Sequence, residues 1–203
     1  MRVGIFGGTF NPPHLGHINM CTLFLEVMKL DKLIVIPACI PPHKQIKSKT
    51  TVEQRLEMSK IAFTPISNKV FVSDIETKRE GKSYTADTIK EIKALGYNDL
   101  YFLCGTDMLL TLDTWYNPKY IFDNATIVYI RRESEIENEH LISNKIMHYK
   151  KTFDASIINI KAKPIELSSS IVRNAIKNGW DASNMLSKGV LEYIAENKLY
   201  ENE

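Results

Sequence analysis

The residues best suited to chemistry lie in one stretch near the N-terminus, Gly4 to His17, which reads GIFGGTFNPPHLGH. His14 and His17 are three residues apart, so they share a face if they lie on the first turn of a helix. Gly7 and Gly8 let the backbone approach a ligand closely because they have no Cβ. A helix N-terminus behind such a turn presents N–H groups and a positive dipole end, which favour phosphate. Together these features predict a nucleotide phosphate site.

A second candidate anion site lies about thirty residues from the C-terminus. Ser168, Ser169 and Ser170 open a predicted helix that carries apolar residues at helical spacing and ends near Gly179. Arg173 is one turn further on, on the face of Ser169 and Ser170. Three serines at a helix start are unremarkable as a cap. Together with the stretch from Gly4 to His17, which we call the first motif, they predict a phosphate clamp made of two parts, of which the serines are the second.

Two loops carry further candidates for a nucleotide site. Lys44 follows the apolar run 33–36 in a proline-rich loop, where it could reach a phosphate or be only a solvated charge. Gly105 and Asp107 follow the apolar run 99–104 directly. The Asp107 carboxylate suits ribose hydroxyls, and a simple helix cap is the alternative.

Thr85 and the pair Trp115-Tyr116 are candidates for binding a flat, charged ring. Thr85 is the expected N-cap of a helix that ends at Gly96, and that N-terminus could bind an anion. Trp115 and Tyr116 precede Asn117-Pro118 in a polar segment, which indicates a loop over the site. An indole face stacks well on a heteroaromatic ring, although aromatic pairs are more often core residues.

The elements that must position these residues alternate between strands and helices. Strands are predicted at 2–6, 33–36, 69–73, 99–104, 125–130 and 157–160, and helices follow the first motif, Thr51, Thr85 and Ser168, with others within 133–153 and around 190–199. This pattern predicts an α/β, Rossmann-like, doubly wound parallel sheet, ordered 3-2-1-4-5, with helices on both faces. Strands one and four meet at the switch point, so His17 and Asp107 should flank one crevice.

Composition narrows the class of protein. The chain has 203 residues and a net charge of +2, and we expect a single domain over 1–203 with no basic stripe for nucleic acid. Its three cysteines match no metal-binding spacing and are expected to be reduced and packed as small hydrophobes. We expect no signal peptide and no membrane span, hence a cytoplasmic protein. The sequence leaves open whether the chain forms a homo-oligomer.

The combined motifs resemble the HxGH nucleotidyltransferase superfamily and, within it, bacterial nicotinate-nucleotide adenylyltransferases. The resemblance runs end to end and rests on residues 7–17, 42–44, 83–85, 105–107, 115–116, 168–173 and 193–200. The family usually has Ile-Ser-Ser-Thr where this chain has Leu-Ser-Ser-Ser at 167–170, a change that keeps the hydroxyl group.

The resemblance implies adenylyl transfer from ATP to nicotinate mononucleotide, giving nicotinate adenine dinucleotide and pyrophosphate in NAD biosynthesis. It assigns catalysis to His14, His17 and Arg173. It assigns ATP binding to Gly7, Gly8, Thr9, Phe10, Lys44, Gly105, Asp107, Ser168, Ser169 and Ser170. It assigns nicotinate mononucleotide to Asn11, Thr85, Trp115 and Tyr116. Mg²⁺ is expected to arrive on the ATP phosphates, with no metal site of protein residues.

Three alternatives remain at this stage. A sister enzyme could act on nicotinamide mononucleotide or phosphopantetheine. A non-catalytic nucleotide sensor would be expected to have lost His14, His17 or Arg173, and all three are present. An RNA-binding synthetase fragment would need a basic face and a true lysine signature, and neither is recognisable.

Overall fold

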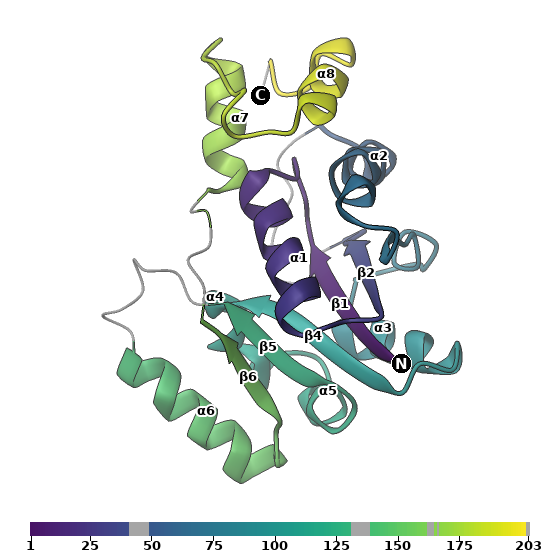
Figure 1. The fold of residues 1–203 in the computed structure, drawn as a ribbon, viewed down its shortest axis with the longest axis vertical. Coiled ribbons are helices and arrows are strands. Elements are labelled where there is room, and N and C mark those ends of the chain that lie inside the picture. The colour runs from purple at the N-terminus through teal and green to yellow at the C-terminus, as the bar shows by residue number, and fades with distance from the viewer. Residues whose placement is uncertain (41–48, 131–138, 162–164, 166, 202–203) are drawn as a thin grey trace.

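The computed structural model describes residues 1–40, 49–130, 139–161, 165 and 167–201. Its centre is a sheet in which every paired strand is parallel, in the order β3-β2-β1-β4-β5-β6. The strands are β1 (Arg2–Gly8), β2 (Lys32–Pro37), β3 (Val70–Val72), β4 (Asp99–Gly105), β5 (Thr126–Ile130) and β6 (Ile157–Ile160). The predicted order 3-2-1-4-5 is confirmed, and β6 extends the sheet beyond β5 (Figure 1).

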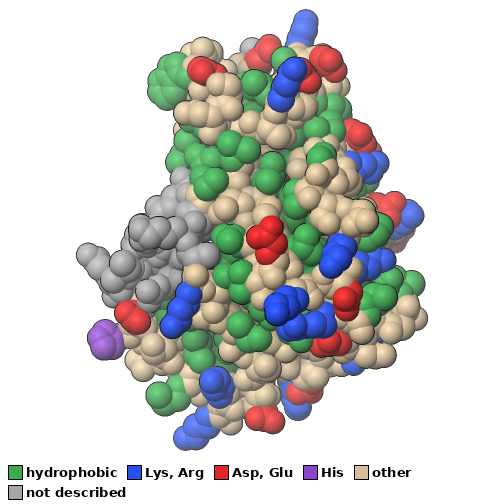
Figure 2. Space-filling model, in the orientation of Figure 1, with side chains coloured by type: hydrophobic (Ala, Val, Ile, Leu, Met, Phe, Trp, Pro, Cys, Tyr) green, Lys and Arg blue, Asp and Glu red, His purple; other side chains and the backbone are tan. Residues whose placement is uncertain are grey.

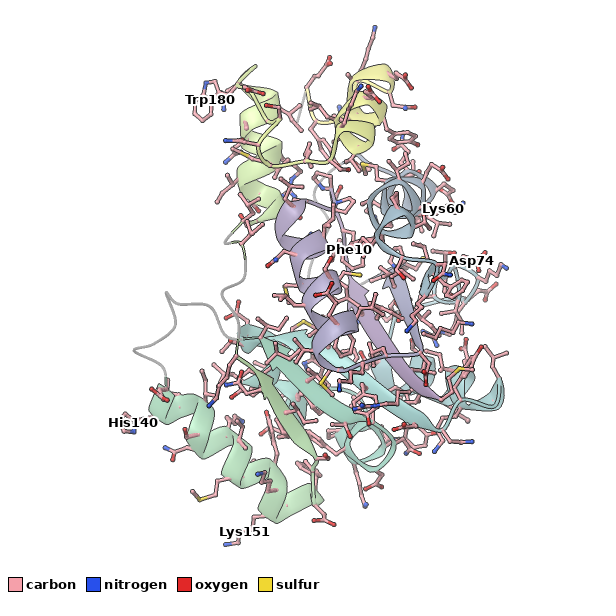
Figure 3. The ribbon with its side chains drawn as sticks, in the orientation of Figure 1. Phe10, Lys60, Asp74, His140, Lys151 and Trp180 are labelled. Carbon is pink, nitrogen blue, oxygen red and sulfur yellow. The ribbon has the colours of Figure 1, made fainter. Side chains whose placement is uncertain are left out.

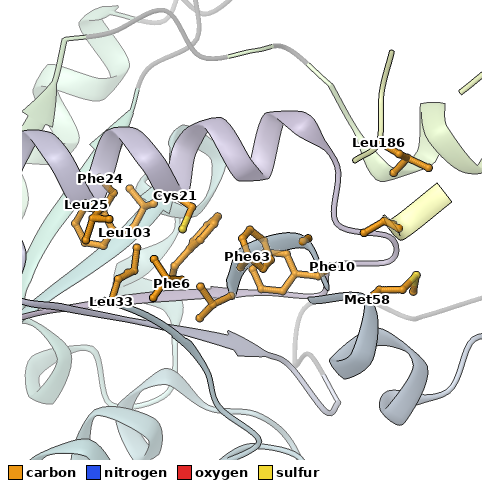
Figure 4. Close-up of a cluster of buried hydrophobic side chains, with 14 of the residues drawn as sticks. Phe6, Phe10, Cys21, Phe24, Leu25, Leu33, Met58, Phe63, Leu103 and Leu186 are labelled. Atoms are coloured by element: carbon orange, nitrogen blue, oxygen red, sulfur yellow. The ribbon is translucent and has the colours of Figure 1, made fainter. Parts of the chain in front are cut away.

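Helices cover both faces of the sheet, as predicted. They are α1 (Leu15–Val27), α2 (Val52–Phe63), α3 (Thr85–Ala94), α4 (Thr106–Leu109), α5 (Pro118–Asn124), α6 (Glu139–Phe153), α7 (Ser169–Lys177) and α8 (Lys188–Glu196), with short 3₁₀ turns at Thr64–Ile66 and Leu112–Thr114. Side chains alternate along each strand, so neighbours such as Ile5 and Phe6 enter different cores. One core joins the sheet to α1, α2, α7 and α8, and the other joins it to α3, α5 and α6. Figure 4 shows the part of the first core in which side chains of α1 and α2 pack against those of the strands.

Two local predictions need correction, and a third is not tested. Thr85 is the first residue of α3 rather than its N-cap, which is Tyr84 and makes no side-chain capping bond. The sequence also predicts a capping box from Thr51 to Gln54 and, on the helix that it opens, an apolar face of Val52, Leu56 and Phe63. The box forms and Phe63 is buried, but Val52 and Leu56 are only partly buried, and α2 buries Arg55 and Met58 as well. The prediction for Lys44 lies outside the described residues.

The cysteines are free, and two of the three behave as expected. Cys21 and Cys104 are buried, and burial raises the pKa of each thiol to about 12, which keeps it protonated. Cys39 is only half-buried. Within the described ranges, no helix has both the length and the apolar character needed to cross a membrane. On the face shown in Figure 2, Lys and Arg side chains are interspersed with Asp and Glu.

Candidate active site

Two adjacent cavities open at the carboxyl end of β1. The first, of about 260 Å³, is lined among others by Gly7, Gly8, Phe10, His14, His17, Gly105, Asp107, Ser168, Ser169 and Ser170. We call it the His–Ser cavity. The second, of about 220 Å³, is lined among others by Thr9, Glu76, Ser83, Tyr84, Thr85, Trp115 and Tyr116. We call it the aromatic cavity. Gly7, Gly8 and Met108 line both, so the last two residues of β1, predicted as a turn, lie in the strand and at the boundary between the cavities.

His14 and His17 are held against each other at the start of α1. His14 is the N-cap, and its Nδ1 accepts a hydrogen bond from the His17 N–H at 3.3 Å. The His17 Nδ1 accepts one from the His14 N–H, also at 3.3 Å, and the two rings stack with centroids 3.7 Å apart. Because each Nδ1 accepts a backbone N–H, each ring carries its proton on Nε2. The pair therefore offers two Nε2–H donors, an arrangement that suits phosphate oxygens.

Gly16, between the two histidines, is required by close packing. A Cβ at this position would lie 2.8 Å from the backbone oxygen of Ile165 and 3.0 Å from the His14 ring. Any larger residue would push the ring or the segment before α7 away. The start of α1 is also anchored by a hydrogen bond of 2.8 Å from the Leu15 N–H to the Met185 carbonyl. The histidines thus sit on a rigid element whose position the C-terminal part of the chain helps to set.

Helix α7 touches the first motif directly. Ser168 caps α7 by accepting the Ile171 N–H, and the Ser169 hydroxyl donates to the Pro12 carbonyl at 3.0 Å. Arg173 Nη1 donates to the Asn11 carbonyl at 2.7 Å, and Nη2 donates to Ser170 Oγ at 3.2 Å. The expectation that two sequence-distant helix starts face one gap is confirmed, because both line the His–Ser cavity.

The aromatic cavity is bounded by the start of α3 and the segment before α5. Thr85 lies at the N-terminus of α3, where backbone N–H groups and the helix dipole favour an anion. The Tyr84 and Tyr116 rings pack with centroids 4.7 Å apart. The Trp115 indole lies edge-on to Phe102, with centroids 6.2 Å apart, and both residues line the cavity.

Glu76 is a site residue that the sequence did not reveal. It is 7% exposed, lines the aromatic cavity, and accepts a hydrogen bond of 2.6 Å from the Thr88 hydroxyl. Burial raises the pKa of its carboxyl group, while hydrogen bonds from Thr88 and Ser83 and the charge of Arg79 lower it. Glu76 follows β3, a strand of only three residues, and no pattern in the sequence marks it.

Arg55 is the second residue that the sequence analysis missed. It is 1% exposed and donates from Nη1 to the carbonyls of Thr9, at 2.8 Å, and Ala38, at 2.6 Å. Its Nη2 donates to the Cys39 carbonyl at 3.1 Å. Arg55 therefore ties the loops after β1 and β2 together behind the cavities. The sequence did hold a sign that Arg55 is buried, because Arg55 lies three residues before the apolar Met58 and shares its helical face.

Among the predicted site residues that the structure describes, all except Asn11 and Arg173 line one or both of the cavities. Thr9 faces the aromatic cavity rather than the His–Ser cavity. Asn11 is 5% exposed, and its backbone carbonyl accepts a hydrogen bond from Arg173. Arg173 acts on this loop and on Ser170 from α7. Asp107, expected as a possible cap, is exposed inside α4, whose N-cap is Gly105.

Comparison with known proteins places the sequence in one family. Residues 5–175 match the model of the cytidylyltransferase-like family. A "probable nicotinate-nucleotide adenylyltransferase" of Borreliella afzelii is 38% identical, with 98% of this chain and 97% of the relative covered. One from Carboxydothermus hydrogenoformans is 34% identical, with 98% of each chain covered.

The solved structures support the fold. The nicotinic acid mononucleotide adenylyltransferase of Plasmodium falciparum, complexed with NaAD, superposes with a TM-score of 0.77 at 21% identity. The superposition covers 100% of this chain and 98% of that one. From its sequence relatives and its fold, the chain is a member of the nicotinate-nucleotide adenylyltransferase family, within the cytidylyltransferase-like proteins.

Proposed function

We propose that this protein transfers the adenylyl group of ATP to nicotinate mononucleotide, giving nicotinate adenine dinucleotide and pyrophosphate as a step of NAD biosynthesis. The observation that carries the proposal is the pair of cavities that meet at Gly7 and Gly8. One offers hydroxyl and imidazole donors for a triphosphate, and the other offers aromatic rings beside a helix N-terminus for a pyridine carboxylate. The two substrates would meet at Gly7 and Gly8, at the end of β1, where the backbone leaves room for a phosphate.

The proposed chemistry needs positioning more than proton transfer. A phosphate oxygen of nicotinate mononucleotide attacks the α-phosphorus of ATP in line, and the bond from that phosphorus to the bridging oxygen breaks. Pyrophosphate leaves with the electron pair, so negative charge grows on its oxygens. The Nε2–H groups of His14 and His17 and the hydroxyl groups of Ser168 and Ser170 would stabilise that charge by hydrogen bonding.

Mg²⁺ enters this proposal as part of the substrate, bound to the triphosphate oxygens and to water. In the parts of the chain that the structure describes, no group of three or more His, Cys, Asp or Glu side chains could hold a metal ion. We place the reaction in the cytoplasm as part of the same proposal, since free cysteines are expected in a reducing compartment.

The test is a pyrophosphate-release assay with ATP and Mg²⁺ and three acceptors: nicotinate mononucleotide, nicotinamide mononucleotide and phosphopantetheine. We expect kcat/KM to be highest with the nicotinate form, by at least about tenfold over the amide, because hydrogen bonds to a charged group contribute roughly 1.5–3 kcal/mol. A preference for either other acceptor would reassign the substrate. No turnover with any of them would favour a nucleotide sensor.

A further inference from the structure

The C-terminal end of the described chain reaches back to the first motif. The Tyr200 hydroxyl donates a hydrogen bond of 2.7 Å to Asn11 Oδ1, across 189 residues of sequence. Both side chains are buried, Tyr200 being 2% exposed and Asn11 5%. A buried hydrogen bond between distant residues fixes one group relative to the other, because breaking it would leave polar atoms without solvent.

Tyr200 is held in place at some cost to its backbone. Its φ is +68°, in the left-handed region that residues other than glycine seldom adopt. The neighbouring Leu199 is buried, and its N–H donates to the Ile194 carbonyl at the end of α8. Such a conformation persists only where the surroundings determine it, and residues of this kind are concentrated at functional sites.

Tyr200 also lies near enough to Arg55, whose guanidinium group supports the loop, to affect the pKa of Arg55. Burial lowers the pKa of Arg55, and the nearby Cys39 and Tyr200 raise it. Arg55 donates to the Thr9 carbonyl, two residues before Asn11. The segment from Thr9 to Pro12 therefore accepts hydrogen bonds from four side chains: Arg55, Tyr200, Ser169 and Arg173.

We propose that Tyr200 is a positioning residue for adenylyl transfer, acting through Asn11 to fix the loop between Gly8 and His14. The inference rests on the proposed function, because it concerns the geometry of that same site. Tyr200 lines neither cavity in the described chain, so its effect passes through the loop. Gly8 and His14, at the two ends of this loop, both line the His–Ser cavity. A shift of the loop would misalign both, and small misplacements are costly in positioning-driven catalysis.

The first experiment compares Tyr200→Phe with the matched control Tyr193→Phe. Tyr193 is on α8, is half-buried, and packs against the same core. Each change removes one hydroxyl group and leaves the ring. We expect Tyr200→Phe to lower kcat/KM by about tenfold, whereas Tyr193→Phe should stay close to wild type. Thermal unfolding of both variants shows whether the fold is intact.

A double-mutant cycle separates positioning from a general loss of stability. The cycle uses Tyr200→Phe, Asn11→Ala and the double variant. If the hydroxyl acts through the Asn11 side chain, Tyr200→Phe should have little further effect on kcat/KM once Asn11 is alanine. A merely structural role would lower the melting temperature without this coupling.

The outcomes separate the inference from the proposed function. If the wild type is active and Tyr200→Phe leaves kcat/KM unchanged, the inference is overturned. It is also overturned if the losses of kcat/KM in the two single variants add in full in the double variant. A wild type that prefers another acceptor would overturn the nicotinate assignment, and the cycle would then use that acceptor. A wild type inactive with all acceptors would overturn the function, and the cycle would then measure the Kd of MgATP, where the same coupling is expected.

Discussion

At the scale of single residues, the two histidines combine a structural and a chemical task. Their Nδ1 atoms cap α1 reciprocally, which replaces the usual Ser, Thr, Asp or Asn at such positions. With Nδ1 of each ring accepting a backbone N–H, each histidine keeps Nε2–H as the donor it can offer to a ligand. The caps thus orient both donors before any ligand binds.

His17→Ala should lower kcat by roughly 10²-fold or more, the order found on losing one donor to a transition state. The reason is its place on the His–Ser cavity, at the first turn of α1. His140→Ala is the matched control, because His140 is exposed on α6, well away from Phe10 at the site loop (Figure 3). Steady-state kinetics with saturating ATP measure both. An unchanged turnover number for His17→Ala would remove this residue from the mechanism.

Glu76 gives a pH-dependent prediction for stability. Because burial raises the pKa of its carboxyl group above the ordinary 4.5, the folded protein holds this proton more tightly than the unfolded chain. Its contribution to the free energy of unfolding is therefore fully present below pH 4.5 and is lost as the pH rises through the folded pKa. Glu76→Gln keeps the shape and stays neutral, so its stability relative to wild type should grow with pH.

Urea unfolding between about pH 4 and pH 8 tests this difference. Glu80→Gln is the control, since Glu80 is exposed in the loop that follows. The control should show a nearly constant difference from wild type over the same range. A Glu76→Gln difference that shrinks or stays flat as pH rises would show that desolvation does not dominate at this carboxyl group.

At the scale of elements, the docking of α7 against the first motif depends on the shape of a guanidinium group. Arg173 spans the Asn11 carbonyl and Ser170 Oγ with two different nitrogens. A lysine keeps the charge but presents a single ammonium group, so it cannot reproduce this fork. The hydrogen bond to Asn11 holds α7 against the first motif, and the one to Ser170, on α7 itself, orients the guanidinium group.

Arg173→Lys should lower kcat/KM by about tenfold or more, because charge-assisted hydrogen bonds contribute roughly 1.5–3 kcal/mol each. Lys177→Arg, on the exposed side of the same helix, is the reverse exchange and should leave kcat/KM unchanged. Circular dichroism verifies that α7 persists in both variants. Equal kinetics for the two variants would show that Arg173 contributes only its charge.

The elements themselves were largely predictable, and the reasons for the misses are local. Apolar runs such as 33–36 and 99–104 marked β2 and β4 because a parallel strand is buried on both faces. Thr85 was misplaced by one position because N-cap preferences favour Thr over Tyr, whereas Tyr84 is the N-cap of α3 and makes no side-chain hydrogen bond there. Arg55 and Glu76 were missed since their partners are carbonyls and hydroxyls that only the tertiary fold brings near them.

At the scale of the whole molecule, the site is formed where segments from the two ends of the chain meet. The first motif supplies one wall of the His–Ser cavity and the start of α7 supplies another, some 150 residues later. The two motifs predicted this meeting, whereas the hydrogen bond from Tyr200 to Asn11 became visible only in the structure. A ligand that bridges both walls should stabilise both together, by about 2.7 kcal/mol at a concentration one hundred times its Kd.

Hydrogen exchange with a non-hydrolysable ATP analogue and Mg²⁺ tests whether one ligand stabilises both walls of the His–Ser cavity. We expect slower exchange in two segments, residues 7–17 and 168–173, because ligand binding opposes the local opening of both walls. Helix α6, whose fifteen residues are all described, supplies no residue to either cavity and serves as the internal control. Protection of one wall alone, or equal protection of α6, would mean that the ligand does not bridge the two ends of the chain.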